Sequence, residues 1–159
     1  CPEVRISDIT GQIVRAIEVA GGMVEGPVSL TGHSAGGHLV ARMCVAGMLR
    51  NALSARLAQV VPISPVADLR PLLKTSMNAQ FGMDLSAAEA ESPVLMTPMA
   101  VPVTVWVGAD ERPAFLDQAR WLAEAWKCRQ VIAPGKHHFD VIEALEDAES
   151  NLVKTRIGW

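Results

Sequence analysis

One short segment, Gly-His-Ser-Ala-Gly at residues 32–36, limits the possible folds more than any other. A predicted strand over residues 27–32 precedes it, and a predicted helix over residues 35–50 follows. A chain that passes from strand to helix so quickly makes a tight turn, and small residues must flank the central one. The two glycines and the alanine meet that need. Such a turn lifts the Ser34 hydroxyl above the sheet, which makes Ser34 a candidate nucleophile.

Strand and helix patterns alternate along the rest of the chain. Predicted strands cover residues 27–32, 58–64, 101–107 and 128–133, and predicted helices cover residues 6–20, 35–50, 113–126 and 139–149. Gly21-Gly22 are expected to stop the first helix, and Pro62 weakens the second strand. Residues 65–100 contain four prolines and predict an irregular, cap-like excursion. The pattern indicates an α/β class with a parallel sheet, helices on both faces and one domain over residues 1–159.

Composition excludes several classes of function. The net charge is -3 with no basic stripe, which argues against a nucleic-acid partner. No run of 18 apolar residues occurs, so no membrane partner is expected. The odd set of Cys1, Cys44 and Cys128 argues against a disulfide framework and favours a reducing, cytoplasmic compartment. Metal-ligand and phosphate-loop spacings are absent from the sequence, so we expect neither a metal nor a cofactor, only a small-molecule substrate.

A serine nucleophile needs a base, and a base needs an acid to orient it. His33 lies inside the turn, with its side chain expected to point away, and His38 is expected to pack or cap. His137 and His138 follow the last predicted strand, and one of them is the candidate base. Two adjacent carboxylates, Asp110 and Glu111, follow the preceding strand and compete for the role of acid. A third carboxylate, Asp68, is a weaker candidate because it follows the wrong strand.

Three motifs together resemble the kynurenine formamidase (arylformamidase) branch of the α/β-hydrolases, close to the esterases and lipases. They are residues 32–39 (GHSAGGHL), 108–118 (GADERPAFLDQ) and 137–143 (HHFDVIE). The resemblance implies an α/β-hydrolase fold with Ser34 as nucleophile and His138 as base. It places Glu111 first and Asp110 second as the acid, although an aspartate is usual there. The backbone N–H of Ala35 is implied as an oxyanion donor.

The sequence departs from that branch in one respect. The branch carries an upstream His-Gly-Gly motif that supplies further oxyanion donors, and no such motif occurs here. We therefore expect the chain to resemble the C-terminal portion of a full-length member, with the first strands of the sheet absent. Loss of an oxyanion donor costs about a hundredfold in rate. A homodimer, or pairing with a missing N-terminal segment, is the expected assembly.

Three functions follow from these residues. The first is a serine hydrolase of tryptophan catabolism that converts an aryl formamide, N-formyl-kynurenine, to kynurenine and formate. The second is a carboxylesterase acting on small esters, and the third is an inactive hydrolase-fold fragment. Trp106, Phe115 and Phe139 are candidate aromatic walls of a substrate site, although packing in the core is the favoured role for each.

Overall fold

The structure, a computed structural model, describes residues 1–157. Within that range one parallel sheet has the strand order β1-β2-β3-β4. Its strands are β1 (Val28–His33), β2 (Leu57–Ile63), β3 (Thr104–Gly108) and β4 (Arg129–Ala133). The α-helices are α1 (Ile6–Gly22), α2 (Ala35–Met43), α3 (Asn51–Ser54), α4 (Asn78–Phe81), α5 (Leu85–Ala90), α6 (Pro113–Trp126) and α7 (Asn151–Ile157). Short 3₁₀ turns are η1 (Arg70–Lys74), η2 (Pro93–Leu95) and η3 (Glu143–Glu146).

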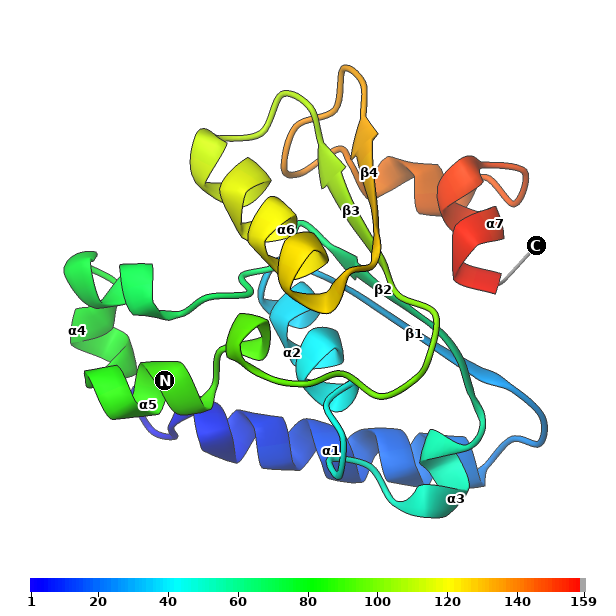
Figure 1. Ribbon diagram of the computed structural model, residues 1–159, viewed down its shortest axis with the longest axis horizontal. Helices are drawn as coiled ribbons and strands as arrows, with labels where there is room; N and C mark the ends of the chain where they lie inside the picture. Colours follow the sequence, from blue (N-terminus) through cyan, green and yellow to red (C-terminus); the bar gives the residue numbers. More distant parts are fainter. Residues whose placement is uncertain (158–159) are drawn as a thin grey trace.

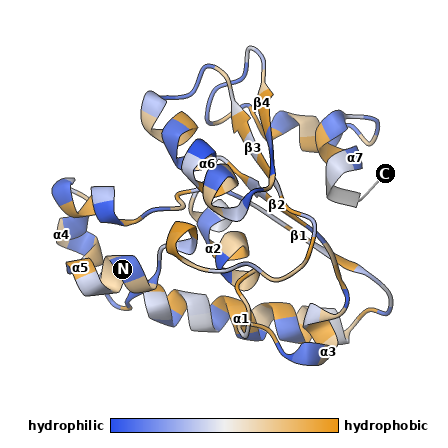
Figure 2. Ribbon diagram, viewed as in Figure 1, coloured by the Kyte–Doolittle hydropathy of each residue, from blue (hydrophilic) through white to orange (hydrophobic). Residues whose placement is uncertain are grey.

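Helices cover both faces of the sheet, as the sequence predicts (Figure 1). Helices α2 and α6 pack on one face around a core that includes Val60, Val105 and Leu122. Helix α7 packs on the other face, where Ile63 and Trp106 are buried. Side chains of successive strand residues point to opposite faces, so both faces of β2 and β3 must be apolar. Helices α1 and α6 each contain both hydrophilic and hydrophobic residues, as expected of helices with one buried face (Figure 2).

Two of the predicted helices were wrong in extent. The helix predicted over residues 35–50 ends at Met43, and Gly47 then adopts a left-handed φ of 85° that a helix does not accommodate. The first helix ends at Gly22, within two residues of its predicted end, with Met23 as the C-cap. A Cβ at Gly21 would lie 2.7 Å from the Leu53 side chain, so this glycine also packs closely against α3.

The helix predicted over residues 139–149 was also wrong. The segment after β4 begins as a loop that the Asp140 carboxylate holds by accepting a hydrogen bond from the His137 N–H at 2.6 Å. Only the short turn η3 forms there, and helix α7 begins after Ser150. The Ser150 hydroxyl accepts a hydrogen bond from the Val153 N–H at 3.1 Å, the arrangement of a helix N-cap.

Strand β2 tolerates Pro62 because the N–H that proline lacks would bond only to β3, one of the two strands beside β2. Alternate residues of β2 donate to β3, with Val60 N–H bonded to Pro102 O at 3.0 Å and Ser64 N–H bonded to Trp106 O at 2.6 Å. Pro62 lies between them, where the next donor would be, and proline has no N–H. The ladder from β1 to β2 runs through the same position without a break.

The excursion over residues 65–100 forms four short helical pieces and is tied to the rest of the protein by a buried polar cluster. The Glu91 carboxylate accepts hydrogen bonds from Thr10 of α1 at 2.8 Å and from Arg42 of α2 at 3.0 Å. The Glu91 backbone carbonyl lies 2.7 Å from Nε2 of His38. Burial of a charge is costly unless it is paired, so this cluster fixes how the excursion sits against α1 and α2.

We expect the stability of the protein to fall at mildly acidic pH because of His38. Burial holds the pKa of His38 below its usual 6.5 in the folded state. As the pH falls below about 6.5, the unfolded chain binds a proton that the folded chain does not, and the free energy of unfolding decreases. One such proton gives a slope of about 1.4 kcal/mol per pH unit. Urea unfolding between pH 7 and pH 5 measures it.

His38→Gln should reduce that slope because glutamine keeps an N–H donor for the Glu91 carbonyl but does not titrate. His137→Gln, which changes a solvent-exposed histidine, is the matched control and should leave the slope as it is. Equal slopes in His38→Gln and the wild type would contradict the prediction.

The turn between β1 and α2 is closely packed against the neighbouring backbone. Ser34 has a φ of 56° and a ψ of -116°, an unfavourable backbone conformation for a residue with a side chain. Its N–H donates to the Ile63 carbonyl at the end of β2 at 2.9 Å. A Cβ at Gly32 would lie 2.3 Å from the Gly36 carbonyl oxygen, and one at Gly37 would lie 2.8 Å from the Ile63 carbonyl oxygen. Helix α2 therefore starts in direct contact with the ends of both strands.

Two adjacent glycines of this turn should respond differently to alanine. Gly37→Ala should lower the free energy of unfolding by about 1–3 kcal/mol, because the new methyl group meets backbone atoms that cannot rotate away. A Cβ at Gly36 meets nothing within 4 Å, so Gly36→Ala should be neutral or stabilising by up to about 1 kcal/mol. Urea unfolding of both variants tests this, and equal losses would show that the contact at Gly37 is not limiting.

Candidate active site

Three side chains from separate loops form a continuous hydrogen-bonded series at the carboxyl end of the sheet. The Ser34 hydroxyl, in the turn after β1, lies 3.1 Å from Nε2 of His138. The other ring nitrogen of His138, Nδ1, lies 2.7 Å from Oε2 of Glu111. His138 comes from the loop after β4 and Glu111 from the loop after β3. The carboxyl ends of parallel strands meet at one edge, which explains why residues so distant in sequence come together.

Glu111, rather than Asp110, is the carboxylate that contacts the histidine. The Glu111 side chain is fully buried, and its second oxygen, Oε1, accepts a hydrogen bond from the Gly108 N–H at 2.9 Å. The Ser64 hydroxyl donates to the same oxygen. Asp110 is exposed, and only its backbone N–H is engaged, by the Lys136 carbonyl at 2.9 Å. The two neighbouring acids therefore have different environments.

Aromatic rings hold the His138 imidazole from several sides. The Phe115 ring stacks on it with a centroid distance of 4.0 Å, and the Phe139 ring meets it edge-on at 5.4 Å. The prediction that His33 points away was wrong, because its ring lies 4.5 Å from that of His138. Burial, and then the electrostatic repulsion that His138 would exert on a protonated ring, lower the pKa of His33. His33 is therefore held neutral beside the second histidine.

The aromatic residues divide between core and site. Trp106 is buried beneath α7, in the core role favoured for it. Phe139 is 78% exposed, so the core role favoured for it was wrong. Phe115 is half-buried and contacts His138. Two of the three candidate wall residues thus lie beside the imidazole.

The remaining sequence candidates lie outside this series. His137 is exposed and faces the Asp140 carboxylate at 3.4 Å. Asp68 forms a two-oxygen ion pair with Arg70, and hydrogen bonding to that guanidinium lowers the pKa of Asp68. Burial raises the pKa of the Cys44 thiol to about 11, which keeps it protonated and unreactive.

The Ala35 N–H lies beside Ser34 at the start of a helix. Ala35 is the first residue of α2, so its N–H has no acceptor within the helix. The partial positive charge of a helix N-terminus favours a negative group at this position. The Ala35 N–H is therefore suited to stabilise an oxyanion that forms next to the Ser34 hydroxyl.

Ser64 is the residue of this region that the sequence interpretation missed. It directly follows β2, is 0% exposed and has a positive φ of 46°. Its position one residue beyond a strand neighbouring the turn at Ser34 is the signal that could have identified it. A buried serine is otherwise a common residue in a protein core, so composition alone would not single it out.

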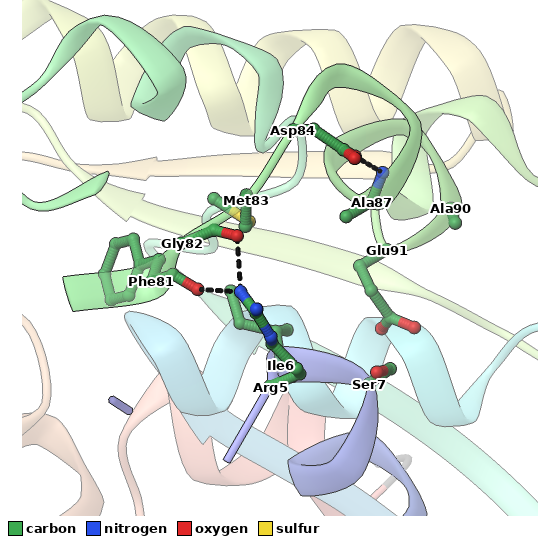
Figure 3. Close-up of a pocket in the computed structure, with 10 residues that line it drawn as sticks. All are labelled: Arg5, Ile6, Ser7, Phe81, Gly82, Met83, Asp84, Ala87, Ala90 and Glu91. Carbon is green, nitrogen blue, oxygen red and sulfur yellow. Dashed lines mark hydrogen bonds between the residues drawn. The ribbon is translucent and has the colours of Figure 1, made fainter. Parts of the chain in front are cut away.

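A separate cavity of about 330 Å³ lies between the start of α1 and the excursion (Figure 3). The Arg5 guanidinium crosses one side of it and donates to the carbonyls of Phe81 and Gly82. Glu91 lies on another side, but Thr10 and Arg42 already bind its carboxylate. None of the residues that line the cavity belongs to the Ser34 series. We therefore place the chemistry at Ser34 and not in this cavity.

No helix within residues 1–157 combines the length and apolar character needed to cross a membrane. No group of three or more His, Cys, Asp or Glu side chains in the same range is arranged to hold a metal ion.

Comparison with known proteins places this geometry in context. No protein-family model matches the chain. Kynurenine formamidase of Salmo salar is 26% identical over 137 residues, which are 79% of this chain and 47% of that protein. A candidate thioesterase from Silicibacter sp. TM1040, known from a crystal structure, shares 60% sequence identity with this chain. The two structures match with a TM-score of 0.97, over 99% of this chain and 60% of that one. The chain thus spans only part of the length of either relative.

More distant structures share the fold. Esterase 2 of Thermogutta terrifontis is 21% identical, with a TM-score of 0.52 over 80% of this chain and 50% of that one. Dipeptidyl peptidase 4 of Porphyromonas gingivalis is 14% identical, with a TM-score of 0.59 over 79% of this chain and 19% of that one. The parallel sheet, its flanking helices and these similarities together show that the chain has the α/β-hydrolase fold.

Proposed function

We propose that the protein is a serine hydrolase that works through an acyl-enzyme intermediate. The observation that carries the proposal is the hydrogen-bonded series from Ser34 through His138 to Glu111, at 3.1 and 2.7 Å. A nucleophile, a base and an orienting acid linked in this order are what acyl transfer from a serine requires. The half-buried position of Ser34 leaves its hydroxyl within reach of a substrate.

The reaction begins when the Ser34 oxygen attacks the carbonyl carbon of the substrate and His138 accepts the hydroxyl proton on Nε2. The Glu111 carboxylate holds the ring so that Nδ1 keeps its proton, and it stabilises the positive imidazolium that forms. The Ala35 N–H stabilises the oxyanion. His138 then donates its proton to the leaving group, which departs as the carbonyl re-forms. Water hydrolyses the acyl-serine by the same steps and restores Ser34.

We propose an aryl formamide of the N-formyl-kynurenine type as the substrate, with formate as the acyl product. Two observations support it: the similarity to kynurenine formamidase and the exposed Phe139 ring edge-on to the base. An exposed aromatic ring beside the reacting groups is suited to contact the aryl part of a substrate. A formyl group is small, so it needs little room between Ser34 and the surrounding rings.

A short-chain ester or thioester is the second candidate substrate. It is favoured by the 60% identity to the candidate thioesterase, which covers almost the whole chain. The same three side chains serve formamides, esters and thioesters, because all three reactions pass through a tetrahedral oxyanion.

Substitution of the two neighbouring acids should separate their roles. Glu111→Gln should lower kcat by about 10³- to 10⁴-fold, because an amide no longer favours the correct histidine tautomer or stabilises the imidazolium. Asp110→Asn, a matched change at the adjacent exposed residue, should leave kcat unchanged. Turnover is measured with N-formyl-kynurenine, p-nitrophenyl acetate and a short-chain acyl thioester. Equal activity in Glu111→Gln and the wild type would contradict the proposed mechanism.

The same assay distinguishes the substrates. Turnover of N-formyl-kynurenine at a kcat/KM at least equal to that of the ester and the thioester supports the formamide. Turnover of the ester or thioester alone would exclude the formamide and leave the serine mechanism in place.

A further inference from the structure

Ser64 combines full burial, a left-handed backbone conformation and a hydrogen bond to the candidate acid. It has no exposed surface and a backbone φ of 46°, in the left-handed region that glycine favours. Its hydroxyl is directed at Oε1 of Glu111. Backbone strain of this kind persists at positions where the surrounding structure requires it, and such positions cluster at functional sites.

Hydrogen bonds from Ser64 and Gly108 hold the Glu111 carboxylate in one orientation. Oε1 accepts hydrogen bonds from the Ser64 hydroxyl and from the Gly108 N–H, at 2.9 Å for the latter. Both donors are thus directed at one oxygen, and Oε2 is left to His138. A glutamate side chain has one more rotatable bond than an aspartate, so it needs more restraint to present an oxygen to a histidine. The two donors supply that restraint.

The backbone at Ser64 also links the acid to the nucleophile. The Ser64 N–H donates to the Trp106 carbonyl of β3, and the preceding residue, Ile63, accepts the N–H of Ser34 at 2.9 Å. The end of β2 therefore holds the nucleophile through its backbone and the acid through a side chain.

We propose that Ser64 is a positioning residue: its strained backbone aims its hydroxyl at Oε1 of Glu111 and so directs Oε2 toward His138. This inference rests on the proposed serine hydrolase function and adds a residue to it. Ser64 touches no substrate and acts only through Glu111.

Replacement of Ser64 by glycine separates positioning from packing. Ser64→Gly removes the hydroxyl but accommodates the positive φ, so relief of the backbone strain should offset part of the cost of the hydrogen bond that the buried Glu111 loses, and the protein should stay folded. Its kcat for the preferred substrate should fall about tenfold to a hundredfold, with KM changed less than twofold, because the orientation of the acid is lost and substrate contacts are not. Unfolding in urea and steady-state kinetics measure the two effects on the same sample.

Lys127 provides the matched control. It also has a side chain at a positive φ, of 50°, and is exposed at the end of α6, away from the site. Lys127→Gly should relieve backbone strain of the same kind and leave kcat unchanged. A loss of kcat in both variants, or in neither, would overturn the role of Ser64.

A double-mutant cycle tests whether Ser64 acts through Glu111. In a Glu111→Gln background, Ser64→Gly should lower kcat by less than twofold, because the acid that Ser64 positions no longer functions. A further tenfold loss would mean that Ser64 acts on another group, and the proposal would fail.

A spectroscopic measurement keeps this inference distinct from the proposed function. The proton on Nδ1 of His138, bonded to Glu111, gives its own proton NMR resonance when the contact is held. We expect a resolved resonance in the wild type and exchange broadening in Ser64→Gly. An unchanged resonance overturns the role of Ser64 even if the protein turns over no substrate. Absence of turnover by the wild type would instead contradict the proposed function.

Discussion

The candidate site depends first on the close approach of α2 to the ends of β1 and β2. Gly37 lies so near the Ile63 carbonyl that no side chain fits there, and Ser34 donates its N–H to the same carbonyl. This contact forces Ser34 into its unusual backbone conformation and raises its hydroxyl above the sheet. It also leaves the Ala35 N–H free of any intrahelical acceptor. The nucleophile and an oxyanion donor are thus consequences of one packing constraint.

The second requirement is that a flexible acid and a flexible base keep fixed orientations. His138 is held by the stacked Phe115 ring and by the half-buried, neutral His33. Glu111 is fully buried and receives donors on the oxygen that does not face the histidine. A charge buried in this way is stable only when its hydrogen bonds are complete. The buried groups around Ser34, His138 and Glu111 therefore stabilise charge as well as exclude water.

The sequence predicted the parallel sheet and the helix at residues 113–126 because each depends on local signals. The central strands β2 and β3 are largely apolar and buried, and Pro113 marks the first turn of α6. The residues alone named Ser34 and left the base open between His137 and His138 and the acid open between Asp110 and Glu111, and the resemblance to kynurenine formamidases favoured His138 and Glu111. These roles stay predictions until activity is measured.

What the sequence did not predict depends on contacts between distant residues. Gly37, and not Gly36, is the glycine that the packing requires, which only the position of β2 reveals. His33 turns toward His138, a residue more than 100 positions away. From the sequence alone, Ser64 cannot be distinguished from an ordinary core serine; its hydrogen bond to Glu111 identifies it. Helix ends were wrong at Met43 and after residue 139 for a similar reason, since loop turns and a serine cap outweighed periodicity.

The most direct test of the account is intact-protein mass spectrometry after exposure to a fluorophosphonate, which reacts only with an activated serine. We expect one covalent adduct per chain in the wild type and none in Ser34→Ala. Absence of an adduct in the folded wild type, or an adduct that persists in Ser34→Ala, would contradict the assignment of Ser34 as the nucleophile.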